Sequence, residues 1–262
     1  MTQPSPLRIE AATGQYLGER KEQQDRTAIF GSPKAPGYLM AILADGMGGL
    51  TGGSLAAEQV IRTAQQNFEQ FSPEADDIEK MLNTIAQEAH TIINLSALSA
   101  DKQPHSTMVI LVLTPGRVAH WAHVGDSRLY YFKGGRFVGR TVDHSFAEKL
   151  ISSKRMSRDE ALNHKHANLL VNVLGTTTSE LFVTVQRYEG YKAGDVFLLC
   201  SDGLWQYFAN DELTGYVCNY APRQAAEMLI TEVAQRGKDT NADNCTIAVI
   251  KISEQPAARI RL

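Results

Sequence analysis

The pattern of apolar and polar residues in the first part of the chain predicts a short strand followed by two helices. The apolar run 38–44 has the length of a buried strand. Beyond a group of glycines, apolar residues recur at every fourth position, as on one face of a helix: Ala56, Val60, Ala64 and Phe68. A second apolar stripe at helical spacing comprises Ile78, Met81, Leu82, Ile85, Ala89, Ile92 and Ile93. Ser72, Pro73 and Glu74 have the order of a helix cap, a first-turn proline and a first-turn acid, which predicts that the second helix begins there.

The middle of the chain contains consecutive strand-like segments that are separated by proline–glycine and glycine–glycine turn signals. These segments are residues 107–113, 117–125 and 128–138. We expect them to form an antiparallel meander. Later segments are strand-like at 181–188, 195–201 and 244–252 and helical at 221–236.

The order of these elements predicts an α+β fold. Strands are grouped in the middle of the chain, whereas strict alternation with helices would indicate a parallel sheet. We therefore expect a sandwich of two antiparallel β-sheets flanked by α-helices, in α-β-β-α layers. Residues 1–252 are expected to form a single domain, and residues 253–262 a loose C-terminal tail. Within the domain, residues 145–175 are polar and irregular, with two short helical pieces, and predict a surface subdomain that we name the flap.

The composition excludes several classes of protein. The chain has 262 residues, of which 43% are hydrophobic and 21% charged, and its net charge of −3 is ordinary for a soluble globular protein. No basic stripe is present, so we expect no nucleic-acid partner. The N-terminus lacks the apolar core of a secretory signal, and no apolar run reaches the roughly 18 residues of a membrane helix. Three cysteines without close pairs argue against a disulfide framework and a zinc site: Cys200, Cys218 and Cys245. We therefore expect a cytoplasmic protein that does not bind membranes.

Five aspartates stand at the ends of predicted strands. Asp45, Asp126 and Asp202 each follow a strand-like run, whereas Asp25 and Asp243 each precede one. Taken singly, such a residue is more often part of a turn or a cap. Carboxylates at the ends of core strands can converge on one edge of a sandwich, where their like charges repel one another. Divalent cations relieve that repulsion, and a ligand set made only of oxygens selects Mg²⁺ or Mn²⁺.

The stretch after Asp45 is unusually rich in glycines, namely Gly46, Gly48, Gly49, Gly52 and Gly53. Glycine permits backbone conformations and close approaches that a Cβ atom would block. We therefore expect another group to lie against this backbone. A glycine beside the acid also lets a backbone carbonyl oxygen serve as a further metal ligand.

Seven short motifs occur in a fixed order between Leu7 and Ile252: RKEQQDR, ADGMGG, STMVILVL, HVGDSRLYYF, DHS, LLCSDGLW and ADNCTIAVI. Together they resemble the metal-dependent serine/threonine protein phosphatases of the PPM, or type-2C, family in its compact bacterial form. Each motif is weak alone, and their order at domain-scale spacing carries the resemblance. The family's fold is a sandwich of two antiparallel sheets between helices, with a dinuclear metal centre at one edge. That fold agrees with the class predicted from the strand pattern.

The resemblance implies which residues bind two Mg²⁺ or Mn²⁺ ions. Asp45 matches the aspartate that bridges both ions. Gly46 matches the residue whose backbone carbonyl oxygen binds one of them. Asp202 and Asp243 match the two acids that complete the site of the other ion.

Three further roles follow from the same resemblance. Asp25 matches an outer-sphere acid that holds metal-bound water. Asp126 matches the acid that, together with Asp202, binds a weaker third metal ion in bacterial members. Arg20 matches the arginine that grips the substrate phosphate, for which a planar guanidinium is suited because it meets two phosphate oxygens at once. The implied catalytic residues are thus Arg20 and Asp45.

The implied activity is the hydrolysis of phosphoserine and phosphothreonine in proteins. Two divalent ions about 3.5–4 Å apart lower the pKa of a bridging water, and the resulting hydroxide attacks phosphorus without a covalent enzyme intermediate. The implied partners are phosphorylated proteins and a bacterial serine/threonine kinase that the enzyme opposes, and the compact domain favours a monomer. Two alternatives stay open: a pseudophosphatase that binds phosphoproteins without cleaving them, and a phosphatase for small phosphoesters or phosphohistidine.

Some positions depart from the family's pattern. Gln23 stands where bacterial members usually have asparagine. Met47 stands where some relatives, mainly eukaryotic, have a histidine proposed as the general acid. A metal-bound water or another histidine would then protonate the leaving group, and the candidate histidines are His105, His123 and His144. A single histidine is nevertheless more often a structural residue.

The remaining conspicuous side chains are interpreted as structural. Arg128 is expected to hold a loop through a salt bridge, and Trp121 and Trp205 are expected to pack in the core rather than against substrate. The basic residues of the flap could attract acidic phosphopeptides, but a solvated helical face is the favoured interpretation. These residues are Lys149, Lys154, Arg155, Arg158 and Lys165.

Overall fold

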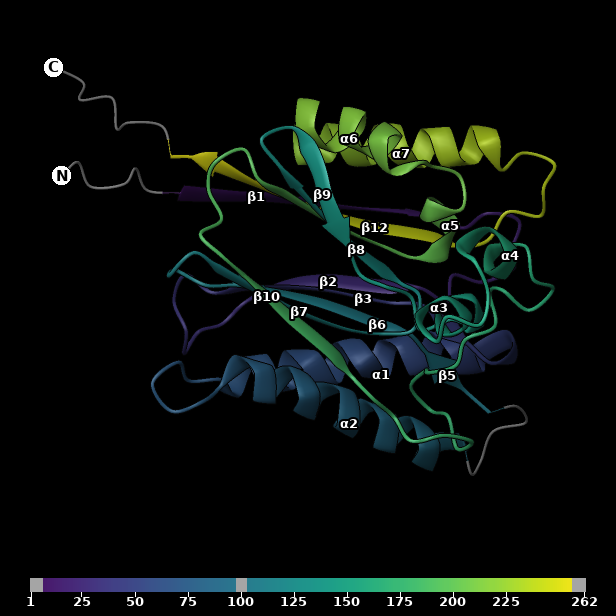
Figure 1. Cartoon of the computed structure of the whole chain (residues 1–262). Helices are drawn as coiled ribbons and strands as arrows, with labels where there is room; N and C mark the ends of the chain where they lie inside the picture. Colours follow the sequence, from purple (N-terminus) through teal and green to yellow (C-terminus); the bar gives the residue numbers. More distant parts are fainter. Residues whose placement is uncertain (1–6, 98–102, 256–262) are drawn as a thin grey trace, which may run out of the picture.

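Two β-sheets pack face to face between two layers of helices in the computed structural model, which describes residues 7–97 and 103–255 (Figure 1). The first sheet contains, in spatial order, β1 (Leu7–Tyr16), β12 (Cys245–Glu254), β11 (Val196–Cys200), β8 (Arg128–Lys133) and β9 (Arg136–Arg140). The second sheet contains β10 (Thr184–Glu189), β7 (Val118–Val124), β6 (Met108–Leu113), β3 (Leu39–Ala44) and β2 (Arg26–Gly31). All neighbouring strands in both sheets are antiparallel, which confirms the predicted sandwich.

Helices cover the outer face of each sheet, so the predicted α-β-β-α layers are confirmed (Figure 1). The helices on the second sheet are α1 (Gly49–Gln70) and α2 (Ile78–Ser96). The helices on the first sheet are α6 (Asn210–Asn219) and α7 (Pro222–Arg236). The short helix α5 (Asp202–Trp205) follows β11 directly. Among the described residues, no helix is long and apolar enough to cross a membrane.

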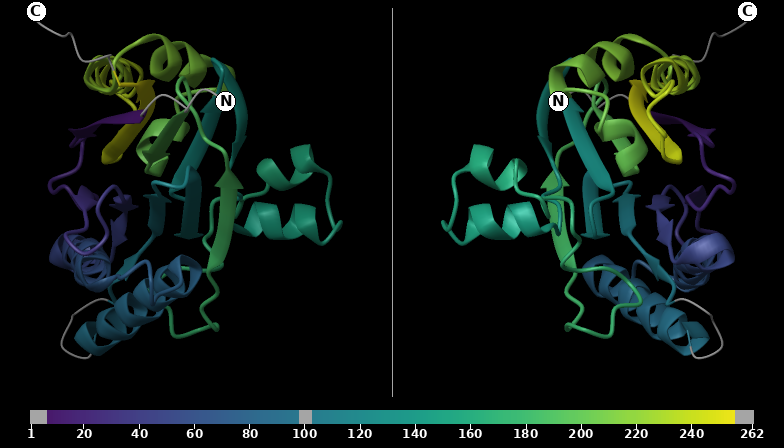
Figure 2. Two further views of the ribbon diagram at one scale, coloured as in Figure 1. Left: turned by 90° about the vertical axis from the view of Figure 1, so that its left-hand side faces the viewer. Right: turned by 90° about the vertical axis from the view of Figure 1, so that its right-hand side faces the viewer.

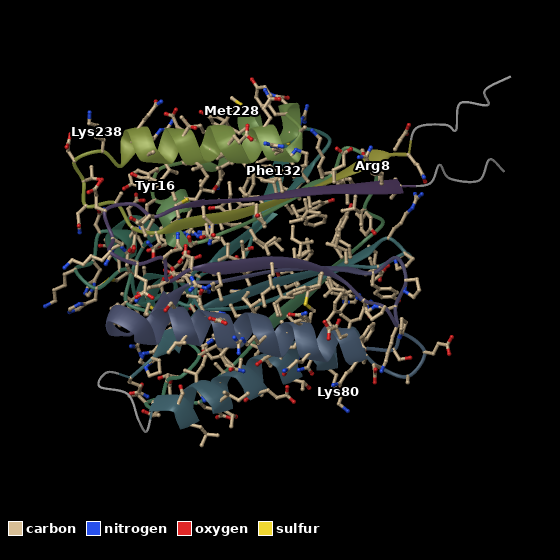
Figure 3. The ribbon with its side chains drawn as sticks, turned by 180° about the vertical axis from the view of Figure 1, so that it is seen from behind. Arg8, Tyr16, Lys80, Phe132, Met228 and Lys238 are labelled. Carbon is tan, nitrogen blue, oxygen red and sulfur yellow. The ribbon has the colours of Figure 1, made fainter. Side chains whose placement is uncertain are left out.

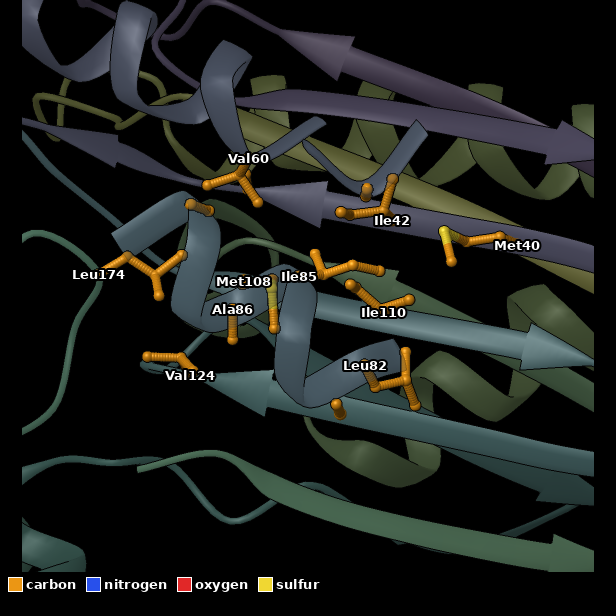
Figure 4. Packing of buried hydrophobic residues seen from close by; sticks show 14 of the residues in the cluster. Met40, Ile42, Val60, Leu82, Ile85, Ala86, Met108, Ile110, Val124 and Leu174 are labelled. Atoms are coloured by element: carbon orange, nitrogen blue, oxygen red, sulfur yellow. The ribbon is translucent and has the colours of Figure 1, made fainter. Parts of the chain in front are cut away.

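The central strands are apolar on both faces. In β3, Met40 and Ile42 belong to the core under α1 and α2, while Ala41 and Leu43 belong to the core between the sheets. Figure 4 shows Met40 and Ile42 on the same side of β3, with Val60 of α1 in the same cluster. Because both faces are buried, the sequence contains a continuous apolar run where a half-exposed strand would alternate.

A corresponding core lies on the other side of the sandwich. Figure 3 shows Phe132 of β8 between the first sheet and its helices, and its side chain is fully buried. Lys80 and Lys238 lie on the outer surface of the molecule in the same view. The molecule thus contains one apolar layer between the sheets and one beneath each pair of helices.

The predicted meander is wrong, because its strands lie in two different sheets. β6 pairs with β7 in the second sheet, whereas β8 pairs with β9 in the first. The chain crosses between the sheets at residues 125–127, where Gly125 has a φ of 98°. When a strand is apolar on both faces, its sequence does not indicate which neighbouring strand it pairs with. The crossing is functionally important because it places Asp126 at the edge of the sandwich.

The second helix begins later than the sequence predicts. Ser72 and Asp76 close a separate turn, in which the Ser72 carbonyl oxygen accepts from the Asp76 backbone N–H at 2.8 Å and the Asp76 carboxylate accepts from the Ser72 N–H at 2.8 Å. The helix α2 starts at Ile78, and the side chain of Asp77 caps it by accepting from the Lys80 N–H at 2.8 Å. The polar groups around Ser72 that resemble a helix start therefore form a local turn before the helix instead.

Both ends of the described chain are strands that the sequence did not predict fully. β1 pairs with β12 over its whole length, from Leu7 opposite Glu254 to Tyr16 opposite Cys245. β1 is rich in small and polar residues, and one of its faces is partly buried while the other is mostly exposed, so its apolar pattern is weak. The expected loose tail at 253–262 is wrong at its start, because β12 continues to Glu254. Residues 256–262 of that tail lie outside the described part of the chain.

The flap projects from one side of the sandwich (Figure 2). It contains two short helices, α3 (Phe146–Ser152) and α4 (Arg158–Leu162), which confirms the prediction of two helical pieces. A small apolar cluster that includes Ala147, Leu150 and Ala161 packs these helices against each other. The flap therefore has its own core, apart from the three layers of the sandwich.

Candidate active site

The five strand-end aspartates come together at one end of the sandwich. Asp45 separates β3 from β4 (Gly46–Met47), and Asp126 lies in the crossing between β7 and β8. Asp202 opens α5 immediately after β11, while Asp25 and Asp243 lie just before β2 and β12. The charges of all four other acids raise the pKa of Asp45. Segments far apart in the sequence thus place five carboxylates within electrostatic reach of one another, and Asp45 lies within reach of all the others.

Burial and mutual repulsion make this cluster unfavourable without cations. Burial, followed by the charges of Asp126, Asp243 and Asp25, raises the pKa of Asp202 to about 8. Burial likewise raises the pKa of Asp25 to about 6 and that of Asp126 to about 6. The pKa of Asp45 also lies well above the usual range, first because of burial. Both effects disfavour ionised carboxylates, and positive charge placed among them would reverse this.

The backbone of Asp45 is held on both sides. Its N–H donates to the Thr107 hydroxyl at 3.0 Å, and its carbonyl oxygen accepts from the Thr107 N–H at 2.8 Å. The Ser106 hydroxyl donates to the same carbonyl oxygen at 3.2 Å. The Thr107 hydroxyl also lies 2.6 Å from that of Ser127, the residue after Asp126. These bonds fix the Asp45 segment and tie it to the crossing that carries Asp126.

The glycines after Asp45 permit a close contact between two backbone segments. A Cβ atom on Gly46 would lie 2.0 Å from the carbonyl oxygen of Gly53 in α1, and one on Gly53 would lie 2.7 Å from the carbonyl oxygen of Gly46. Gly48 and Gly49 have φ values of 136° and 82°, which suit glycine. The group expected against this backbone is therefore the first part of α1 itself.

Replacement of Gly46 by alanine is expected to destabilise the protein by about 3 kcal/mol or more, because backbone atoms on both sides must move to admit the methyl group. Urea unfolding of the metal-free protein measures the change. Gly215→Ala in α6 is the control, because nothing lies within 4 Å of its added Cβ and alanine favours a helix. Equal stabilities of the two variants would contradict the expected clash.

Asp25 is oriented by neighbours that the sequence analysis did not identify. The Ser201 hydroxyl donates to the Asp25 carboxylate at 2.7 Å and accepts from the Thr246 N–H at 3.0 Å. The Asp25 N–H donates to the side-chain oxygen of Gln23 at 3.0 Å, and the Gln23 amide donates to the Tyr16 carbonyl at 3.1 Å. Gln23 thus bridges two backbone positions, and its longer side chain is accommodated.

The loop that carries Arg20 is tied to the start of β12. Asn244 accepts from the Gln24 N–H at 2.8 Å and donates to the Leu17 carbonyl at 2.8 Å. Arg20 lies at the rim of the carboxylate cluster, and its Nη2 is 2.5 Å from Asp243 Oδ2. The side chain of Arg20 is 50% exposed. The guanidinium therefore lies within reach of both solvent and the acids.

Arg128 is a structural residue, as the sequence predicted. Its guanidinium makes two bonds to the Asp143 carboxylate, at 2.8 and 2.6 Å, and lies over the Trp205 ring at 3.7 Å. Trp205 packs against the core of the first sheet and also donates its indole N–H to the Asp126 carbonyl at 3.0 Å. Trp121 packs against the core between the sheets. Both tryptophans thus contact the core as predicted, and Trp205 additionally supports the Asp126 backbone.

The three candidate histidines lie in two different places. His105 stands opposite Met47 in the pair formed by β4 and β5 (His105–Ser106), next to the Asp45 segment. His123 and His144 are buried and stack on each other, with ring centroids 4.4 Å apart. Burial lowers the pKa of each of the three. Of these, His105 alone lies on a strand directly paired to the residues that follow Asp45.

The donor set fits hard divalent cations. It offers carboxylate oxygens and the Gly46 backbone carbonyl, and its acids carry raised pKa values that bound cations would lower. Among the described residues, no group of three or more Asp, Glu, His or Cys side chains is already arranged to hold a metal ion. All seven residues predicted for the site lie at this end of the sandwich, and their individual roles stay predictions: Arg20, Asp25, Asp45, Gly46, Asp126, Asp202 and Asp243.

Comparison with known proteins agrees with the geometry. Residues 17–242 match the profile of the family described as protein phosphatase 2C. The serine/threonine phosphatase stp of Listeria innocua is 28% identical over 238 residues, which cover 88% of this chain and 91% of that protein. The structure of the S. agalactiae serine/threonine phosphatase has a TM-score of 0.79 at 22% identity, covering 94% of this chain and 99% of the other. The catalytic domain of the phosphatase PstP, solved in complex with two manganese ions, has a TM-score of 0.75 at 24% identity, covering 95% and 100%.

Proposed function

The chain belongs to the protein phosphatase 2C family, and we propose that its five-carboxylate cluster is the active site of a metal-dependent serine/threonine protein phosphatase. The observation that carries this proposal is the convergence of five aspartates from five segments, whose charges act on one another at one end of the sandwich. The names of relatives and the manganese complex of PstP support both the activity and the use of two Mg²⁺ or Mn²⁺ ions.

The roles proposed for the acids are those that the family resemblance implies. Asp45, which is within electrostatic reach of the other four acids, would be shared by two ions, and the Gly46 carbonyl oxygen would hold one of them. Asp202 and Asp243 would hold the other ion. When bound, the two ions supply an activated water for attack on phosphorus and positive charge for the phosphoryl oxygens.

The outer acids support this centre. The Ser201 hydroxyl donates to the Asp25 carboxylate and orients it, and Asp25 would in turn orient water near the metal ions. Asp126 would share a weaker third metal site with Asp202, whose pKa is raised by the charge of Asp126. A single domain that extends to the end of β12 at Glu254, with the flap at 145–175, remains part of the proposal.

Arg20 binds the substrate phosphate. Its guanidinium is at the rim of the site and half exposed, so phosphate oxygens can replace the Asp243 carboxylate as its partner. A planar guanidinium meets two phosphate oxygens together, which an ammonium group cannot do. Arg20 thereby positions phosphorus and offsets charge on the phosphoryl oxygens as the bond to the leaving group breaks.

Replacement of Arg20 by alanine is expected to lower kcat/KM for a phosphothreonine peptide about 100-fold, and Arg20→Lys is expected to lie between that variant and the wild type. Steady-state kinetics with saturating Mn²⁺ measures both. The matched control is Arg62→Ala, which removes an exposed guanidinium that is likewise 2.5 Å from a carboxylate but lies on α1. A similar loss in both alanine variants would contradict a phosphate-binding role.

The substrates are phosphoserine and phosphothreonine in proteins, including those of a bacterial serine/threonine kinase that the enzyme opposes. We further propose that the enzyme acts as a monomer in the cytoplasm. Comparison of kcat/KM for a phosphothreonine peptide, a small aryl phosphate and a phosphohistidine peptide tests the substrate class. The phosphothreonine peptide is expected to be preferred by about 10-fold or more, because a peptide offers binding contacts beyond the phosphate that a small aryl phosphate lacks. Preference for either of the other compounds would contradict this assignment.

A further inference from the structure

His144 lies at the base of the flap and joins it to the turn that carries Asp126. We propose that His144 is a positioning residue, whose imidazole fixes the Asp126 carboxylate beside Asp202 by tying that turn to the end of the flap and to β10. This inference rests on the proposed function, because it concerns acids assigned to the metal centre. It assigns His144 no contact with substrate, although the sequence makes it a candidate general acid.

The first connection is to the residue before Asp126. The Gly125 N–H donates to His144 Nδ1 at 3.2 Å, and the His144 N–H donates to the Gly125 carbonyl at 2.9 Å. Gly125 is packed so closely that an added Cβ would lie 2.7 Å from a methyl carbon of Thr107. Residue 144 thus holds both the N–H and the carbonyl of the turn immediately before Asp126.

The second connection is to the C-terminal part of the flap. The Asn172 amide donates to the same His144 Nδ1 at 2.8 Å, and the Val171 N–H donates to the His144 carbonyl at 2.9 Å. Phe182 fixes the orientation of the Asn172 amide, because its carbonyl accepts from Nδ2 at 2.7 Å and its N–H donates to Oδ1 at 3.3 Å. Asn172 is 1% exposed. One imidazole nitrogen therefore receives hydrogen bonds from both the Asp126 turn and the flap.

These contacts determine the state of the ring. Because a backbone N–H donates to Nδ1, that nitrogen carries no proton, and the proton of the neutral ring lies on Nε2, from which it is donated to the Thr184 hydroxyl at 3.0 Å. Burial, and then the neighbouring His123, lower the pKa of His144 to about 3, while Asp143 acts in the opposite direction. The imidazole therefore stays neutral at physiological pH and keeps both sets of partners.

The turn that His144 holds is directly linked to the metal centre. Among the charged neighbours of Asp202, Asp126 has the largest effect on its pKa. The Asp126 carbonyl accepts from the Trp205 indole at 3.0 Å, and Ser127 bonds to Thr107 at 2.6 Å. Without the imidazole, the turn keeps only the backbone bond from the residue 144 N–H to the Gly125 carbonyl on the flap side and loses the acceptor of the Gly125 N–H. Partners that orient ligands in this way typically change metal affinity by about 10- to 100-fold.

His144→Leu tests this role by removing both nitrogens, and His144→Asn restores an acceptor in the place of Nδ1. The matched control is His90→Leu on α2, because His90 Nδ1 accepts from the Gly175 N–H at 3.1 Å at the same end of the flap but contacts no residue of the Asp126 turn. Titration with Mn²⁺, followed by electron paramagnetic resonance of the free ion, measures binding without turnover. Asp126→Asn identifies the binding step that depends on Asp126.

We expect His144→Leu to weaken that Mn²⁺ step about 10- to 100-fold, His144→Asn to weaken it less, and His90→Leu to leave it unchanged. Equal weakening by the two leucine variants, or none by His144→Leu, overturns the proposal. If His144→Leu does not fold, Thr184→Val removes only the partner of Nε2 and is expected to weaken the step about 3-fold. An unchanged affinity in that variant overturns the proposal equally.

A second measurement separates failure of this inference from failure of the proposed function. The Trp205 indole N–H donates to the Asp126 carbonyl, so its nuclear magnetic resonance signal in metal-free protein reports on the turn. His144→Asn or Thr184→Val is expected to shift this signal, whereas His90→Leu is not. A signal unmoved by either substitution rejects the role of His144 even where metal binding is normal. A shifted signal in a protein that binds no Mn²⁺ supports positioning by His144 and rejects the proposed metal centre.

Discussion

Replacement of Asp45 by asparagine is expected to lower kcat on a phosphothreonine peptide by about 1,000-fold or more, at any Mn²⁺ concentration. Asp45 is the acid whose pKa all four other aspartates raise, so it is the side chain best placed to bridge two cations. In the proposed centre, loss of its charge would weaken the binding of both ions and disturb the positive charge that faces the phosphoryl oxygens. Removal of one preorganised electrostatic group of this kind typically costs a factor of about 100 to 1,000, and here two ions depend on it.

The same substitution is expected to stabilise the metal-free protein. Burial and four neighbouring charges disfavour the ionised form of Asp45, and the neutral amide avoids this penalty. A variant that is inactive yet more resistant to urea cannot have lost activity by unfolding. Asp211→Asn on the exposed side of α6 serves as the control and is expected to keep wild-type activity. An active Asp45→Asn enzyme would contradict the assignment of Asp45 as the bridging ligand.

The second large effect is expected in the pH dependence of stability. In the folded metal-free protein the pKa of Asp202 is raised from 3.8 to about 8, and those of Asp25 and Asp126 from 3.8 to about 6. Between 3.8 and these values the folded state binds more protons than the unfolded state, so stability falls as pH rises through this window. One kcal/mol changes the Tm of a domain of this size by about 2–4 °C. We therefore expect the metal-free Tm to fall by roughly 10 °C between about pH 5 and pH 8.

Bound metal is expected to reverse this loss at the alkaline end. Mn²⁺ at 100 times its Kd adds about 2.7 kcal/mol to the free energy of unfolding, which corresponds to roughly 5–10 °C in Tm. The gain is smaller near pH 5, because protons then compete with the cation for the carboxylates. Differential scanning calorimetry of metal-stripped and Mn²⁺-loaded protein across this range measures both effects. Asp202→Asn should flatten the metal-free curve, and a wild-type curve that rises toward pH 8 without metal would contradict the raised pKa values.

The sequence was sufficient to locate the carboxylates. Asp45, Asp126 and Asp202 each follow an apolar run, and strand ends in a sandwich meet at a shared edge. The grouping of strands in the middle of the chain also predicted the layered fold, and the apolar stripes of α1 and α2 do pack on a sheet. The sequence pattern does not show how strands that are apolar on both faces pair. The segment through Gly125 was therefore predicted to be a turn within one meander, whereas it connects the two sheets.

The supporting residues of the site were beyond the reach of local pattern. Ser201 binds Asp25 across 176 positions of sequence, and Asn244 binds Gln24 across 220. A serine before an aspartate and an asparagine after one have many other uses, and only the folded chain brings each to its partner. For Asn244 the sequence contained a weak indication of a role at the site, because this residue directly follows Asp243. For the close contact of Gly46 with Gly53, the sequence predicted only that some group lies against the glycine-rich backbone. It did not identify that group as the first part of α1.

Turnover of a phosphothreonine peptide by metal-stripped protein, with and without added Mn²⁺, tests the central claim most directly. Calorimetric binding of the same peptide should be measured on the same samples. A phosphatase whose carboxylate cluster is a metal centre is inactive when stripped and regains hydrolysis as Mn²⁺ is added, while Asp45→Asn stays inactive. Protein that binds the peptide but never hydrolyses it with Mn²⁺ or Mg²⁺ would contradict the enzymatic role and indicate a phosphoprotein-binding module with the same fold.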